Sequence, residues 1–336
     1  MSGSISFNGM PASIRVPGTY IEIDNSRALR GLTDWPAKVL MLGQRLTTGT
    51  VAALTPVRVT SADQARTYFG RGGLLAHMFE AWFRANPATE IWAVPMDDAA
   101  AGVAATQTVT VSGPSTASGE IALMIAGRRV PVTVTSGLAS TAIATAIAAA
   151  VNAALDLPVT ASAATSVVTL TARHKGECGN AIDVRHSYYA GEALPAGVTL
   201  AIATGVSGTT NPVVTTALDV VAETWFTDIV TPWTDATNIA ALEARLATNF
   251  GPTVMRDGHA WAGMSGTHSA LTTYGAARNS PQLSVIGVRG SPTPPWEWAA
   301  GLASVCVPAL ALDPARPVQT LQIPGVLAPP LASRFT

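Results

Sequence analysis

Lys38-Val39-Leu40-Met41-Leu42-Gly43 contains four large apolar residues in succession, which is typical of a strand covered on both faces of a sheet. Helical patterns follow over residues 62–69 and 74–84, and a second apolar strand pattern follows over 90–94. Ser61 can cap the first helix and Gly70 can end it. The order strand, helix, helix, strand indicates an α/β sheet, so we expect residues 37–100 to form the first part of a doubly wound core domain.

The composition changes after Asp97-Asp98-Ala99 to Thr, Ser, Ala, Val and Gly with almost no charge. Alternating residues predict strands over 106–112, 121–126, 130–135, 159–163 and 167–172, and an alanine-rich segment predicts a helix over 139–154. A glycine-containing joint at 205–208 marks the far edge. We therefore expect an inserted α+β domain over residues 101–208.

Helix and strand patterns alternate again over residues 209–312. We expect strands over 226–231, 259–263 and 283–288, and helices near 212–222, 235–250, 268–277 and 296–307. Residues 37–100 and 209–312 thus predict one discontinuous α/β core. Residues 313–336 contain five prolines, so we expect an extended segment, unless something docks it, that leads to a C-terminal domain missing from this chain.

Residues 1–36 predict an extended N-terminal arm with one strand-like segment, Tyr20-Ile21-Glu22-Ile23. This segment has turn formers on both sides and no neighbouring hairpin partner. Its backbone donors and acceptors must pair with a sheet elsewhere, either in the same molecule or in another one. We interpret these four residues as a candidate subunit-interaction site, and the arm indicates assembly.

The composition limits the classes of function. Charged residues make up 12% of the 336 residues, about half the usual share of roughly 25%. Two interpretations stay open: copies of the chain cover much of its surface, or Ser and Thr do. The net charge is −1, without a Lys/Arg cluster for nucleic acid. No secretory signal is found, and the apolar segments 139–157 and 299–312 are too interrupted or too short to span a membrane.

Four patterns raise the question of chemistry, and each has a simpler interpretation. Ser265 lies between a strand and a helix, as hydrolase nucleophiles do, with Asp228 and His259 as the remaining triad candidates, but the G-x-S-x-G pattern is absent. A turn with a capping residue is favoured. Gly70-Arg71-Gly72-Gly73 precedes a helix, so an anion could bind at the helix N-terminus. A glycine cap followed by a tight turn explains the pattern better.

The other two patterns are polar. His174 and Cys178 provide two of the three or four ligands that zinc requires, so a solvated loop is favoured. Asp97 and Asp98 are adjacent carboxylates at a domain joint, where general acid-base catalysis is not expected. Cys178 and Cys306 have no disulfide or metal spacing, which favours free thiols in a reducing compartment. We expect no catalytic residue, no cofactor and no metal.

Several sequence phrases, in this order and spacing, resemble tail sheath proteins of contractile bacteriophages, especially their Mu-like branch. They are residues 17–26, 39–44, 70–72, 75–79, 125–130, 170–176 with 179–180, and 227–233. The resemblance spans nearly the whole chain and implies a subtilisin-like α/β core without protease activity. It also implies a structural protein of the virion that assembles in the host cytoplasm as stacked rings, with the tail tube, baseplate and tail terminator proteins as partners.

In such proteins the terminal arms add strands to neighbouring subunits, and contraction of the lattice drives the tube through the host envelope. Family members continue beyond Thr336, so we expect this 336-residue form to be unable to build a normal sheath. The alternative function is a serine hydrolase on the same core, with Ser265 as the nucleophile. A surface adhesion module carried by the insert is a third interpretation, but it would require an export signal.

Overall fold

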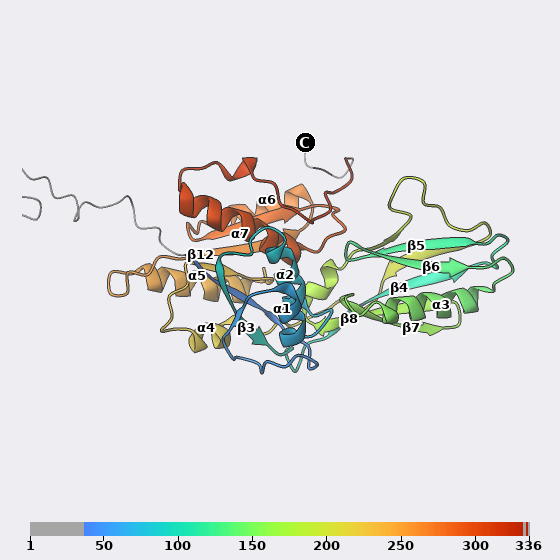
Figure 1. The fold of residues 1–336 in the computed structure, drawn as a ribbon, viewed down its shortest axis with the longest axis horizontal. Helices are drawn as coiled ribbons and strands as arrows, with labels where there is room; N and C mark the ends of the chain where they lie inside the picture. The colour runs from blue at the N-terminus through green and yellow to red at the C-terminus, as the bar shows by residue number, and fades with distance from the viewer. Residues whose placement is uncertain (1–36, 332–333, 335–336) are drawn as a thin grey trace, which may run out of the picture. The chain divides into compact units, whose positions relative to one another are not determined.

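The computed structural model describes residues 37–331 and residue 334. The candidate strand Tyr20, Ile21, Glu22 and Ile23 therefore lies outside the described residues. The described part is a mixed α/β structure with one six-stranded sheet and two smaller sheets (Figure 1).

The six-stranded sheet has the order β13-β12-β11-β1-β3-β2. Five of its strands are parallel, and β2 pairs with β3 in the antiparallel direction. The strands are β1 (Lys38–Gln44), β2 (Val57–Val59), β3 (Glu90–Met96), β11 (Asp228–Val230), β12 (His259–Ser265) and β13 (Leu283–Val288). Since β1 lies inside the sheet with helices on both sides, its four large apolar residues are fully buried, as the sequence predicts.

Helices cover both faces of this sheet. Val39 and Met41 of β1 pack in the cluster that contains α1 (Ala62–Phe69), α2 (Leu74–Phe83) and α7 (Pro295–Leu312). The alternate residues Leu40 and Leu42 pack in a second cluster with α4 (Val214–Val220) and α5 (Ala236–Phe250). Successive strand residues point to opposite faces, so one apolar run supplies both clusters. The short helix α6 (His268–Ala276) contributes no buried residue.

Several predicted boundaries in the core were wrong. The strand predicted over 226–231 is confined to β11, and the helix predicted from Pro212 begins at Val214, where the Asn238 side chain accepts a hydrogen bond from the Val214 N–H at 2.9 Å. Strand β2 was not predicted. Helix α7 continues past Pro308 to Leu312. Within the described residues α7 alone has the length and apolar composition to cross a membrane, and 61% of it is buried inside the protein.

The proline-rich segment after α7 is docked. The carbonyl of Gly325 accepts a hydrogen bond from Arg84 Nη1 at 2.7 Å. Leu327 donates its N–H to Thr293 Oγ1 at 3.0 Å and accepts the Ser291 hydroxyl at 2.6 Å. A short 3-10 turn, η2 (Val318–Thr320), lies within this segment. These contacts replace the free extended segment that proline content alone predicts.

Two antiparallel sheets lie between β3 and α4 along the chain. The four-stranded sheet has the order β10-β4-β8-β7, and the three-stranded sheet has the order β6-β5-β9. The elements are β4 (Ala104–Ser112), β5 (Gly119–Ile125), β6 (Arg128–Val134), α3 (Ser140–Ala153), β7 (Val159–Ala164), β8 (Val167–Lys175), η1 (Glu177–Ala181), β9 (Val184–His186) and β10 (Thr199–Thr204). Strands β9 and β10 were not predicted, because neither contains a fully buried residue that would mark it in the sequence.

Candidate functional site

The β5–β6 hairpin carries an arginine into the helices of the core. Ala126 and Gly127 form its two-residue turn with φ of 51° and 74°, the left-handed geometry of tight hairpin turns. Arg128 follows at the start of β6. Its Nη1 donates to Glu297 Oε1 of α7 at 2.8 Å, and its Nη2 donates to Glu80 Oε2 of α2 at 3.2 Å. We call the two antiparallel sheets and α3, over residues 104–204, the sandwich region. One side chain of this region thus bridges two core helices.

The two carboxylates are buried, since Glu80 is 8% exposed and Glu297 is 2% exposed. Glu80 has a second partner, because Arg66 Nε donates to its other oxygen at 2.8 Å. Two guanidinium groups therefore balance two carboxylates. Burial lowers the pKa of Arg128, but Glu297 and Glu80 raise it by more, so the arginine stays charged. Buried charges of this kind are tolerated only when they are paired. We call Arg66, Glu80, Arg128 and Glu297 the junction clamp.

His77 lies beside the clamp on α2 and is fully buried. Its Nε2–H donates to the carbonyl of Asp156, in the loop after α3, at 2.8 Å. Its Nδ1 has no hydrogen-bond partner among the described residues and lies 4.0 Å from Glu297 Oε1. Burial, and then the charge of Arg128, hold the pKa of His77 well below its ordinary value. The imidazole is therefore neutral.

A second network joins the two parts of the chain at the end of β3. Asp98 Oδ1 accepts from His174 Nδ1 at 2.9 Å and from Gln44 Nε2 at 2.7 Å, and Asp98 Oδ2 accepts from the Lys175 N–H at 2.9 Å. His174 Nε2 accepts from the Leu74 N–H, in the first turn of α2, at 3.1 Å. Burial raises the pKa of Asp98, but the hydrogen bonds that it accepts from His174, the Lys175 N–H and Gln44 lower it by more.

This network brings together three patterns that the sequence analysis treated separately. The α2 N-terminus after Gly70–Gly73 receives the His174 imidazole in place of an anion. Asp97 does not join its neighbour Asp98, since it pairs with Arg45 at 2.8 Å. Cys178 donates its thiol to the Pro232 carbonyl at 3.7 Å, and burial raises its pKa to about 12. Over residues 37–331, no cluster of three or more metal-ligating side chains is found.

A third contact is the ion pair between Arg71, just before α2, and Asp156. Arg71 Nε and Nη2 donate to the two carboxylate oxygens at 2.9 and 2.7 Å. This two-point geometry is the strongest form of arginine-carboxylate pairing. The side chains are 55% and 38% exposed, however, so water weakens the pair.

Ser265, Asp228 and His259 do not form a triad. Asp228 and His259 are register partners at the start of β11 and β12, whereas Ser265 is the last residue of β12. A seven-residue strand spans about 20 Å at ~3.3 Å per residue. His259 Nε2 instead contacts Ser284 Oγ at 2.9 Å, and Asp228 accepts from the Trp261 indole at 2.8 Å.

The junction clamp was not predicted from the sequence. Arg128 belongs to the phrase 125–130, but its acidic partners are 48 and 169 residues away. A signal did exist: Glu80 is the one acidic residue in the apolar helix Leu-Leu-Ala-His-Met-Phe-Glu-Ala-Trp-Phe. An acidic residue among so many buried neighbours requires a partner.

Two family models and one curated relative match this chain. The family model of the phage tail sheath protein beta-sandwich domain matches residues 100–203, and that of the phage tail sheath protein central domain matches residues 207–336. The Mu-like prophage FluMu tail sheath protein of Haemophilus influenzae is 40% identical over 332 residues, which cover 99% of this chain and 68% of that relative. The chain belongs to the phage tail sheath protein family. The resemblance seen in the sequence is confirmed.

Two solved sheath tail proteins are more distant from this sheath protein. That of Listeria innocua is 13% identical with a TM-score of 0.32, and the match covers 80% of this chain and 56% of that one. That of Desulfitobacterium hafniense is 15% identical with a TM-score of 0.32, and the match covers 86% of this chain and 62% of that one. The chain therefore spans about three fifths of the length of these two proteins.

The residues that match the beta-sandwich family model include Arg128, Asp156 and His174. Glu297 lies in the central-domain match, whereas Glu80, Arg71 and Asp98 precede both matches. Each of the three contacts thus joins the sandwich region to helices or strands outside it. The site is a structural junction in a structural tail protein.

Proposed function

We propose that this sheath protein polymerises as stacked rings around a tail tube and contracts to drive the tube through the host envelope during genome delivery. The single observation that supports this most is the 40% identity to a Mu-like prophage tail sheath protein over 332 residues. In this proposal the protein is a virion component that assembles in the host cytoplasm. Its partners are further copies, the tail tube protein, and the baseplate and tail terminator proteins.

The proposed architecture is a doubly wound, subtilisin-like core formed by residues 37–100 and 209–312, with an inserted domain over 101–208 and the proline-rich segment 313–336 after the core. The strand order, which reverses on either side of β1, and the helices on both sheet faces support it. The proposal includes no catalysis, no cofactor, no nucleic-acid binding and no membrane insertion. The separation of Ser265 from Asp228 and His259 along β12 supports the absence of hydrolase chemistry.

The junction clamp has a mechanical role in this proposal. A contracting lattice moves subunits relative to one another, and each subunit must transmit that movement without coming apart. Arg128 joins the sandwich region to α2 and α7 through buried ion pairs, which are costly to break one partner at a time. The clamp therefore keeps both parts of a subunit together while contacts between subunits change.

The N-terminal arm over residues 1–36 is proposed to link subunits, with Tyr20, Ile21, Glu22 and Ile23 as the strand added to a neighbour. The test is electron microscopy of the protein expressed from its complete reading frame, with and without residues 17–26. We expect hollow helical polymers from the wild type and folded but unpolymerised protein from the deletion. Polymers of unchanged yield and shape in the deletion would overturn the role of the arm.

A fluorophosphonate probe tests the hydrolase alternative. We expect no labelling of the native protein, with trypsin as the positive control. Labelling that disappears in Ser265→Ala would instead favour the enzyme.

A further inference from the structure

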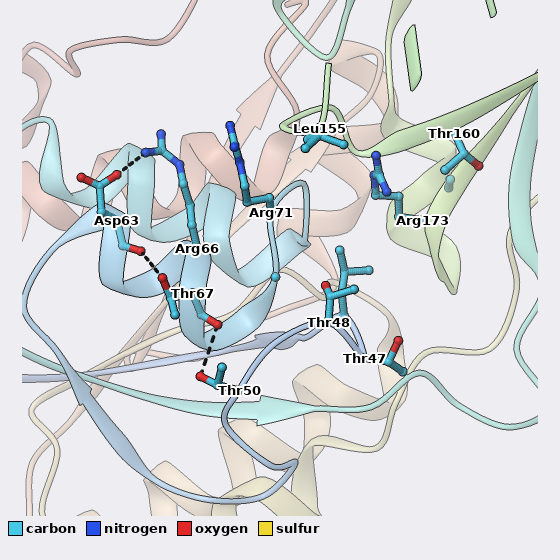
Figure 2. Close-up of a pocket in the computed structure, with 13 residues that line it drawn as sticks. Thr47, Thr48, Thr50, Asp63, Arg66, Thr67, Arg71, Leu155, Thr160 and Arg173 are labelled. Atoms are coloured by element: carbon cyan, nitrogen blue, oxygen red, sulfur yellow. Dashed lines mark hydrogen bonds and ion pairs between the residues drawn. The ribbon is translucent and has the colours of Figure 1, made fainter. Parts of the chain in front are cut away.

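A hollow of about 930 Å³ lies between the loop after β1, helix α1 and strand β8 of the sandwich region. Figure 2 shows three arginines, Arg66, Arg71 and Arg173, around it, together with the hydroxyls of Thr47 and Thr48. We call it the arginine hollow after these three residues. Asp63 is the one acidic residue in its lining.

Two of the three arginines are already neutralised. Arg66 pairs with Glu80 at 2.8 Å and with Asp63 at 2.5 Å. Arg71 pairs with Asp156 through the two hydrogen bonds that its Nε and Nη2 donate. Neither arginine therefore has an unmatched charge.

Arg173 differs from the other two. Its Nε donates to the carbonyl of Leu157 at 2.8 Å, which fixes the guanidinium group. Its Nη1 and Nη2 have no hydrogen-bond or ion-pair partner among the residues that the structure describes. Burial lowers the pKa of Arg173, and the more distant charge of Asp156 raises it by less. The group is thus partly desolvated without a matching carboxylate.

Other arginines, such as Arg84 and Arg256, also have only carbonyl partners, but Arg173 lines a hollow together with two further arginines. The two free nitrogens form a planar fork, which matches the two oxygens of a carboxylate. The hollow holds roughly 30 waters at ~30 Å³ each, so a small free anion would fill little of it. A protruding segment of polypeptide with an acidic side chain fits the volume and the charge better.

We propose that the arginine hollow binds an Asp or Glu carboxylate of a second copy of this chain, with Arg173 as the residue that holds it. The inference rests on the proposed function, because polymerisation supplies the second copy. The chain itself offers a complementary group. Glu223 is exposed and, within residues 37–331, has no hydrogen bond or ion pair.

Zero-length cross-linking with a carbodiimide tests the occupant. The variant Arg173→Lys, expressed from the complete reading frame, supplies an amine at this position, and mixing ¹⁵N-labelled with unlabelled subunits separates links between copies from links within one. We expect a link from position 173 to an Asp or Glu of another copy. The control is Arg129→Lys, since Arg129 pairs with Glu120 and Glu192 of its own chain. Polymers in which position 173 links only within its own chain would overturn the inference.

Polymerisation provides the second measurement. We expect Arg173→Gln to raise the protein concentration needed for polymers about tenfold, as loss of a charge-assisted hydrogen bond predicts, while Arg129→Gln leaves it unchanged. Circular dichroism of the unpolymerised variant checks that it is folded. Wild-type polymers with no change in a folded Arg173→Gln variant would overturn this inference alone. Wild-type protein that forms no polymer would overturn the proposed function itself.

Discussion

Arg128 Nη1 donates to Glu297 Oε1 at 2.8 Å and thereby joins two residues that are 169 positions apart. Glu297 is 2% exposed, so this bond lies where water cannot replace it. Removing either partner leaves an uncompensated charge inside the protein. The junction clamp therefore links the stability of the sandwich region to that of the core helices.

Arg128→Met should lower the free energy of unfolding by about 3–5 kcal/mol, because Glu297 would lose its only guanidinium partner and Glu80 would keep only Arg66. Urea denaturation of the purified protein measures this. The neighbouring variant Arg129→Met is the control, since Arg129 is 43% exposed and its pairs lie at the surface. We expect the control to lose no more than about 1 kcal/mol. Equal losses in the two variants would contradict the clamp.

His77 should make the protein less stable as the pH falls below 6.5. Its folded-state pKa is lowered by burial. Below pH 6.5 the imidazole therefore binds a proton in the unfolded chain but stays neutral in the folded protein. One such histidine contributes a slope of up to about 1.4 kcal/mol per pH unit. His77→Gln keeps a donor for the Asp156 carbonyl, and we expect a shallower slope between pH 7 and 5 in denaturation series. An unchanged slope would show that His77 takes up its proton in the folded protein.

Asp98 should also contribute stability that is lost on acidification, but at a lower pH than His77. Its folded-state pKa is lowered from 3.8, so its contribution is fully present above pH 4 and is lost as the pH falls through the folded value. Asp98→Asn should be less stable at pH 7 and should lose part of the acid dependence between pH 4 and 2. Asp97→Asn is the matched control, because Asp97 is 57% exposed. A control with the same loss as Asp98→Asn would contradict this role.

Gly127→Ala should destabilise the protein for two reasons. The residue has a φ of 74°, which costs a side chain roughly 1–2 kcal/mol, and the new Cβ would lie 3.1 Å from Thr293 Oγ1. Gly137→Ala is a control for the first reason alone, since Gly137 has a φ of 82° and nothing within 4 Å of its added Cβ. Thermal unfolding of both variants separates the two contributions. A smaller loss in Gly127→Ala than in Gly137→Ala would contradict a close hairpin contact.

Both cysteines should resist modification in the native protein. Burial raises the pKa of Cys178 to about 12 and that of Cys306 to about 11, and the thiolate is the reactive form. Titration with Ellman's reagent at pH 8 should detect no fast-reacting thiol before denaturation and two thiols in 6 M guanidinium chloride. Rapid reaction of a native thiol would show that the described burial is incomplete.

The sequence predicted the elements whose signal is local. Helix α1 and strand β13 occupy the residues expected, because a capping Ser61 and a terminal Gly70 bound the helix and the large aliphatic residues of Leu-Ser-Val-Ile-Gly-Val mark the strand. Strands β9 and β10 were missed, since their residues are only partly buried. Their partners in the sheets are distant in the sequence, and no local pattern reveals such pairing.

The same distinction holds for the site. Gly70–Gly73, Asp98 and His174 each drew attention by residue type, but only the folded chain shows that Asp98 binds His174 and that His174 receives the Leu74 N–H. The pairing of Arg128 with Glu80 and Glu297 could not be inferred, because an ion pair depends on distances that sequence separation does not determine.

Apolar periodicity, caps and recurrent phrases in the sequence were by themselves sufficient for a mixed α/β structure and the tail sheath family, because each depends on neighbouring residues or on their order. The tertiary structure alone decided which charges meet in the interior and which arginines line one hollow. Burial makes those pairings energetically decisive, and burial is a property of the packed chain.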